Sequence, residues 1–148
     1  MAAPNTAVPQ GVLNRLRTSL TVVNFPQLNV TASFLGRRSI RLTREGRAVE
    51  NLDSLTGIVP SGEPYYKMAA HINLLKSQAL ANAYEQQLLT NANIGDVIVR
   101  TDTSTLQSFT ISNCSIISID ELSFAGDTPD YLATVEGYYS INSALYNS

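Results

Sequence analysis

The sequence predicts an α+β protein that is mainly β, a β-sandwich or barrel with one flanking helix and a long extended loop. Apolar and polar residues alternate over 65–75 and again over 131–141, as in strands that bury one face. Between these segments, after Ser77, apolar residues recur at helical spacing. Because the chain has 148 residues, we expect a single domain over 1–148.

The N-terminal part predicts an arm followed by two strands. Two prolines and small residues over 1–10 indicate a flexible arm, and 11–16 could form a short helical turn. Alternation over 28–35 predicts a half-buried strand, with Leu28, Val30, Ala32 and Phe34 on its apolar face. A tight turn at 36–38 would then lead into a second strand over 39–43.

The segment 44–64 predicts an extended loop. It carries three glycines and two prolines and has little periodicity. Long connections inside compact domains are uncommon and often functional. We therefore expect an extended hairpin or arm here, with a short strand over 55–59.

The clearest strand signal is followed directly by the predicted helix. Met68, Ala70 and Ile72 belong to the apolar face of the strand over 65–75. Ser77 can serve as N-cap of a helix of about fifteen residues, because its hydroxyl can accept from a free N–H of the first turn. The helix is expected to bury one face, formed by Leu80, Ala83, Tyr84, Gln87 and Leu88, and to end at 93–95.

The remaining segments return to strand periodicity. We expect a strand over 96–101 with Val97 and Val99 inward, and a turn over 102–105. A long strand or bent pair should follow over 106–124, with Ile111, Ile117 and Ile119 on one face. The parity of its apolar residues changes near 113–115, which indicates a bulge. A turn over 125–129 then precedes the final strand.

Charge is divided unequally along the chain. Residues 1–76 hold nine of the ten basic residues and four of the twelve acids, a net charge of +5, whereas 77–148 hold Arg100 and eight acids, a net charge of −7. Unlike patches on one molecule can direct its association with other copies. The alternative is that both halves mix in one fold and the charges scatter over its surface.

Little in the composition points to catalysis. The chain has one histidine, His71, and one cysteine, Cys114, so an intrachain disulfide is excluded and a zinc site of the usual kind lacks ligands. His71 lies on the polar side of its strand and is expected at a surface or interface, whereas Cys114 is expected to be a buried thiol; the alternative is a nucleophile and base pair. We expect no enzyme activity, metal or cofactor. Apolar runs are too short to span a bilayer, and the N-terminus lacks a secretory pattern, so no membrane partner is expected.

Five arginines over 37–47 form the basic cluster. Nucleic-acid binding would use them to neutralise phosphates, but the cluster lacks aromatic residues for stacking and the whole chain carries a net charge of −2. A subunit contact and a solvated face are the other interpretations.

The last 85 or so residues resemble the tail tube (inner tube) proteins of contractile-tailed bacteriophages. The strand from Tyr66 runs into the helix SQALANAYEQQLLTN, then IGDVIVRTD, the strand FTISNCSI and the closing DYLATVEGYYSIN. The resemblance implies a virion structural protein, assembled in the host cytoplasm, in which six subunits form a ring and rings stack into a tube. It further implies that 44–64 contacts the neighbouring ring, that the sheath surrounds the tube, and that a tape-measure protein and later DNA occupy the lumen.

The resemblance and the charge split together predict two sets of residues. At subunit contacts, basic residues are expected to face acidic turns of a neighbour: Arg37, Arg38, Arg41, Arg44 and Arg47 against Asp120, Glu121, Asp127 and Asp130. DNA should pass without sequence-specific binding, so the arginines are expected away from the lumen. Polar residues of strands are candidates to line the lumen: Asn29, Thr31, Ser33, Lys67, His71 and Asn73. Two alternatives are a tube or ring subunit of a related injection machine (pyocin-like, secretion system, baseplate or terminator) and a monomeric β-barrel that binds a small ligand or acts as an enzyme.

Overall fold

The computed structural model describes residues 10–119, 122 and 124–146. Its main sheet has six antiparallel strands in the order β1-β6-β7-β8-β5-β2. Their bounds are β1 Ser19–Val22, β2 Leu35–Glu45, β5 Tyr65–Leu75, β6 Asn93–Arg100, β7 Phe109–Ile119 and β8 Asp130–Ser140. A separate two-stranded sheet pairs β3 (Val49–Asp53) with β4 (Ile58–Gly62). The helices are α1 (Ala79–Thr90) and the short α2 (Ser143–Tyr146), and two 3-10 turns lie at Pro26–Leu28 and Ala32–Phe34.

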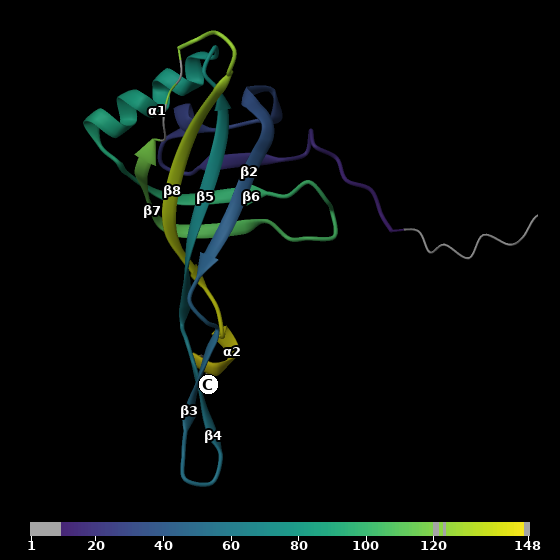
Figure 1. The fold of residues 1–148 in the computed structure, drawn as a ribbon, viewed down its shortest axis with the longest axis vertical. Coiled ribbons are helices and arrows are strands. Elements are labelled where there is room, and N and C mark those ends of the chain that lie inside the picture. Colours follow the sequence, from purple (N-terminus) through teal and green to yellow (C-terminus); the bar gives the residue numbers. More distant parts are fainter. Residues whose placement is uncertain (1–9, 120–121, 123, 147–148) are drawn as a thin grey trace, which may run out of the picture.

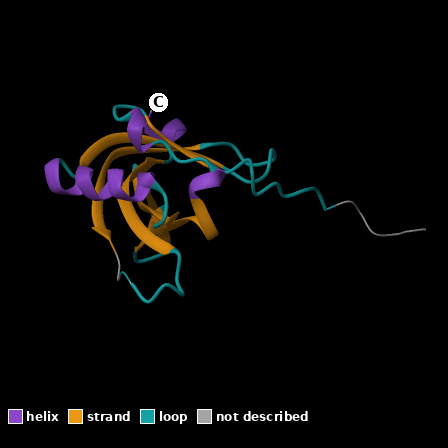
Figure 2. Ribbon diagram, turned by 90° about the horizontal axis from the view of Figure 1, so that it is seen from above, coloured by secondary structure: helices purple, strands orange, loops and turns teal. Residues whose placement is uncertain are grey.

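The six-stranded sheet curls around its apolar interior, and α1 lies along one side of the curl (Figure 2). The β3–β4 hairpin projects from the opposite end, away from the sheet, with α2 beside its base (Figure 1). The prediction of a mainly β fold with a flanking helix is therefore confirmed. In the described residues, no helix is both long and apolar enough to cross a membrane.

Alternation along β5 and β8 builds the core, as the sequence predicts. Met68, Ala70, Ile72 and Leu74 are fully buried. Opposite residues of an antiparallel pair share one face of the sheet, so the pairs Ala70↔Val135 and Ile72↔Ala133 form continuous apolar rows across the two strands. Val97 and Val99 of β6 also point inward, as expected.

Helix α1 closes one side of the core with its apolar face. Leu80, Tyr84 and Gln87 are buried, as predicted. The Tyr84 hydroxyl donates a 2.8 Å hydrogen bond to the Leu28 carbonyl, which ties the helix to the first 3-10 turn. The predicted N-cap is wrong: the helix begins at Ala79, and Gln78 occupies the N-cap position without a side-chain hydrogen bond to the helix. Its predicted end is also late, because 93–95 already belongs to β6.

Residues 28–35 do not form the predicted strand. Two 3-10 turns flank Val30, which makes a bridge to Leu20 with backbone bonds of 2.9 and 2.8 Å. The predicted facing is nevertheless right at Leu28 and Val30, which are buried against the core. Alternating burial therefore arises here without a strand, because the two 3-10 turns direct the side chains of Leu28 and Val30 into the core.

The tight turn predicted at 36–38 is also wrong. Strand β2 continues from Leu35 to Glu45 and absorbs the extra residues in a bulge, with a register shift between Leu35 and Ile40. Ser39 lies within this bulge with φ of +55°. Near the N-terminus, a turn at 15–17 replaces the helical turn expected over 11–16, and residues 1–9 of the predicted arm lie outside the described residues.

The predicted bulge near 113–115 is confirmed. The register of β7 against β8 shifts between Ser112 and Ser115, and Asn113 has φ of +50°. Beyond the bulge Cys114 and Ile116 are buried, whereas Ile117, predicted on the same face as Ile111, is exposed. The change in parity therefore marks the bulge, because residues of the same parity before and after it lie on opposite faces of the sheet.

Candidate assembly surfaces

The β3–β4 hairpin is the part of the molecule with the largest concentration of exposed apolar side chains. The prediction of an extended hairpin at 44–64 is confirmed, although the strands lie at 49–53 and 58–62 and Leu55 falls in the turn between them. The register places side chains of Leu52 and Val59 on one face and those of Val49 and Ile58 on the other. Leu55 at the tip is fully exposed, Ile58 on one face is 62% exposed and Val59 on the other is 54% exposed, so both faces present apolar side chains to solvent.

The C-terminal segment braces the base of this hairpin. The side-chain amide of Asn142 donates to the carbonyl oxygens of Ala48 and Glu63, at 2.9 and 2.7 Å, and so links both strands. Leu145 of α2 lies so close to Gly62 that a Cβ there would be 2.6 Å from its Cδ2. Sequence reasoning missed α2; the positive φ of Asn142, +54°, is compatible with its residue type but gives no signal for these distant partners.

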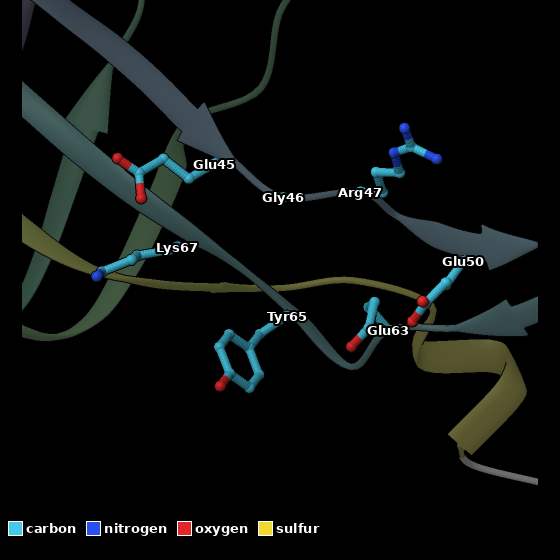
Figure 3. A pocket seen from close by; sticks show the side chains of 7 residues that line it. All are labelled: Glu45, Gly46, Arg47, Glu50, Glu63, Tyr65 and Lys67. Atoms are coloured by element: carbon cyan, nitrogen blue, oxygen red, sulfur yellow. The ribbon is translucent and has the colours of Figure 1, made fainter.

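A shallow hollow with mixed charge lies where the hairpin leaves the sheet (Figure 3). It is lined by Glu45, Gly46, Arg47, Glu50, Glu63, Tyr65 and Lys67. Gly46 has φ of +93°, a conformation that favours glycine, at the point where β2 passes into the hairpin. Among the described acids none lies within 4 Å of Arg47, so the hollow offers both signs of charge to a second molecule.

The face of the sheet opposite the core is polar. His71 lies at its centre, with Nε2 3.2 Å from the Thr43 hydroxyl and Nδ1 3.3 Å from the Thr134 hydroxyl. Lys67 Nζ lies 3.1 Å from Glu136 Oε1, and the hydrogen bond and charge of this carboxylate raise the pKa of Lys67. This surface is therefore suited to contact with water.

The five arginines do not form one patch. Arg41 is the cross-strand partner of His71 and shares the polar face. Arg44 lies on the opposite face, with its guanidinium carbon 5.5 Å from the centre of the Phe109 ring. Arg47 lies at the base of the hairpin, and Arg37 and Arg38 line separate hollows beside the bulge of β2.

The predicted acidic partners are also dispersed. Asp120 and Glu121 lie outside the described residues. Asp127 is exposed in a bend and accepts from the Thr128 hydroxyl, whereas Asp130 begins β8 and packs near Gly36 of its own chain. Asp127 is thus the described acid of this set that is most available to a neighbour.

The predicted lumen residues fall into two groups. Lys67 and His71 share the polar face of β5, whereas Asn29, Thr31 and Ser33 lie in the 3-10 region, where the Asn29 side chain accepts from the Val22 N–H at 2.8 Å. Asn73, the remaining candidate, lies on the same strand as Lys67 and His71. It is only 3% exposed, and Gly36 of the same chain lies beside its side chain.

Arg41 and His71 were expected at different surfaces, but their pairing places them on one face. If His71 faces a lumen, Arg41 faces it too. The prediction that the arginines lie away from the lumen and the prediction that His71 lines it therefore cannot both hold at Arg41.

The two potentially reactive side chains lie on opposite sides of the sheet. Cys114 is buried, its thiol lies 3.3 Å from the Ile111 carbonyl, and burial, together with the charge of Asp96, raises its pKa to about 12. His71 contacts threonine hydroxyls on the other face, so the structure does not bring the two together as nucleophile and base. No cluster of three or more metal-binding side chains is found among the described residues.

Comparisons with known proteins give a structural likeness but no likeness in sequence. No protein-family model matches the sequence, and no curated protein matches it. Among solved structures, the chain is similar to the tube-terminating cap of the anti-feeding prophage, determined by cryo-electron microscopy. The two are 12% identical, with a TM-score of 0.46, and the alignment covers 95% of each chain.

Proposed function

We propose that this protein is a structural, non-catalytic subunit that assembles with copies of itself into the tube of a phage tail or a related injection machine. In the more specific form of the proposal, six subunits form a ring, and stacked rings form the inner tube of a contractile tail, through which DNA is ejected. The observation that carries it is the β3–β4 hairpin, which projects from the sheet with apolar residues exposed on both faces.

An uncovered hairpin of this composition requires a partner. An isolated two-stranded hairpin is marginally stable in water. Full burial of a Leu, Val or Ile side chain is worth about 1.5–3 kcal/mol, so covering Leu52, Ile58 and Val59 would contribute substantially to a contact. A contact between this hairpin and a different surface of the next copy is head-to-tail and can propagate without closing, which is what a growing tube needs.

The polar face of the sheet is our candidate for the lumen. Its charges are mixed, and Lys67 is already paired with Glu136. A wall with few unpaired cations would hold DNA weakly, because each phosphate contact adds to affinity. Under the proposal, a tape-measure protein occupies this channel before DNA and the sheath binds the outer surface.

Negative-stain microscopy of the purified full chain tests the proposal. Long tubes at low ionic strength would support an inner-tube subunit, whereas rings that do not stack would favour a baseplate or terminator ring. A monodisperse particle of about 16 kDa under all conditions would exclude both and leave a monomeric β-barrel. Because exposed charges are screened by salt, tubes should also shorten or dissociate as salt rises.

A matched pair of variants separates assembly from folding. Replacing Leu52 and Val59 together by Ser removes one apolar face of the hairpin and should abolish tubes. Replacing Leu89 by Ser is the control, because Leu89 is 70% exposed on α1, away from the hairpin. Tubes from the hairpin variant would show that the hairpin is not the contact.

A further inference from the structure

We infer that the hairpin joins the next copy by backbone pairing through the outer edge of β3, not that of β4, and that the strand it pairs with is β2 of that copy. The inference rests on the proposed self-assembly and specifies its contact. It follows from the hydrogen-bond parity of the hairpin, from the open edges of the main sheet and from the charges on the strands concerned.

Two backbone hydrogen bonds, one at each end of the hairpin, determine which residue pairs of its ladder are hydrogen-bonded to each other. The Glu63 N–H donates to the Ala48 carbonyl at 2.9 Å, and the Ser54 N–H donates to the Gly57 carbonyl at 2.8 Å. Hydrogen-bonded and non-bonded pairs alternate along an antiparallel ladder. With the observed register, the pairs Val49↔Gly62, Asn51↔Pro60 and Asp53↔Ile58 are therefore the non-bonded ones, and their backbone groups point away from the hairpin.

The two outer edges are consequently unequal. On β3, Val49, Asn51 and Asp53 each present an N–H and a carbonyl outward, a continuous row that an added strand can use. On β4, the middle outward position is Pro60, which has no N–H to donate. Only the β3 edge therefore offers a complete set of backbone groups.

Strand β2 is the best receiving edge on a second copy. It is an end strand of the six-stranded sheet and is eleven residues long. The other end strand, β1, has four residues, and its outer side is already bridged by Val30. Among the described residues β2 is thus the longest strand with an unpaired edge, and such edges readily accept another strand.

Charge favours the same pairing. Strand β3 carries Glu50 and Asp53 and no basic residue. Strand β2 carries four arginines and one acid. Unlike charges favour this pairing, whereas two copies of β2 or two copies of β3 would repel each other.

Proline substitution separates the two edges. Asn51→Pro removes only an outward N–H of β3, so the hairpin's own ladder keeps its bonds; Pro60→Ala restores the missing donor on β4. We expect Asn51→Pro to reduce the pelleted, polymerised fraction of the full chain at least tenfold at an unchanged urea midpoint, and Pro60→Ala to match the wild type. If Asn51→Pro assembled as well as the wild type, the inference would be overturned, whereas the proposed function would stand because tubes still form.

Disulfide trapping provides a test that does not depend on proline. In a Cys114→Ala background, a chain with Asn51→Cys is mixed with chains carrying one cysteine at each position from Arg37 to Arg44 in turn, then oxidised during assembly. A covalent heterodimer at one or two of these positions is expected, and Pro60→Cys should give none. Absence of a heterodimer at every position, while the mixture assembles, would overturn the pairing. Failure of the wild type to assemble at all would instead overturn the proposed function and this inference with it.

Discussion

The six-stranded sheet and the β3–β4 hairpin are built from the same antiparallel ladder but place their apolar residues differently. In the sheet, residues such as Ile72 and Val135 are fully buried, whereas in the hairpin Leu52 and Ile58 remain about half exposed or more. Strand formation alone therefore does not secure burial. The sheet buries its own apolar residues, whereas those of the hairpin stay exposed to solvent in the described part of the chain.

The largest expected difference between the regions comes from truncating an apolar side chain. Ile72→Ala should lower the free energy of unfolding of the monomer by about 2–5 kcal/mol, because it leaves a cavity in the core. Ile58→Ala, the same change in the hairpin, should alter it by about 0.5 kcal/mol or less. Urea denaturation measures both. Similar losses would mean that the hairpin contributes to the stability of the monomer.

A second pair of variants adds a methyl group to a glycine instead of truncating an apolar side chain. Gly137→Ala would place a Cβ 2.5 Å from the Ser112 carbonyl oxygen and 2.8 Å from Cys114 Sγ. We expect a loss of about 1–3 kcal/mol from overpacking. Gly57→Ala, in the hairpin turn, meets no atom within 4 Å and should be close to neutral. Thermal unfolding would contradict this if both variants melted alike.

Removing one hydrogen bond should have a smaller effect. Tyr84→Phe leaves the buried Leu28 carbonyl without the 2.8 Å bond it accepts, at a cost of about 1–2 kcal/mol. Ser54→Ala removes an exposed bond of 2.9 Å to the Gly57 carbonyl in the hairpin turn, where water can replace it. Equilibrium unfolding should therefore show a lower free energy of unfolding for Tyr84→Phe and almost no change for Ser54→Ala.

A further effect concerns stability at alkaline pH and is absent at neutral pH. Burial raises the pKa of the Cys114 thiol from 9.0 to about 12, so the folded state keeps the proton that the unfolded chain loses. The resulting stability is fully present below pH 9 and is lost as pH rises from 9 towards 12, by at most about 1.4 kcal/mol per pH unit. Cys114→Ala should flatten this part of the stability profile. An unchanged profile would contradict the assignment.

Thiol alkylation extends the same comparison to the hairpin. At pH 8, Cys114 in the folded protein should react slowly with a maleimide, because the reactive thiolate is scarce and buried. A cysteine introduced by Val59→Cys should react fast in the monomer and become protected on assembly. Mass spectrometry of both sites, before and after assembly, makes the measurement. If the introduced thiol stayed reactive in tubes, that face of the hairpin would lie outside the contact.

The sequence was sufficient where the periodicity of a single helix or strand determines which of its side chains are buried. The strand over 65–75, the helix face around Tyr84 and the bulge near Asn113 all follow from local periodicity. It was insufficient where a distant residue decides the outcome. The segment 28–35 alternates like a strand, but the bridge between Val30 and Leu20 and two 3-10 turns produce that alternation.

The positions of the candidate site residues were harder to predict from the sequence than the helices and strands. The hairpin could be predicted from its glycines and prolines, but not that its apolar residues remain exposed. Parity places Asn73 on a polar face, but the residue is buried in the structure, beside Gly36. The arginines share one short stretch, yet strand alternation separates Arg41 from Arg44, and the bulge of β2 separates Arg37 and Arg38 from both.

The brace formed by Asn142 has a consequence for the order of synthesis. Its amide holds Ala48 and Glu63, residues made 94 and 79 positions earlier. A chain still on the ribosome can pair β3 with β4, but it lacks this clamp until Asn142 has emerged. The base of the hairpin is therefore braced only after β8, the strand that precedes Asn142, has also been made.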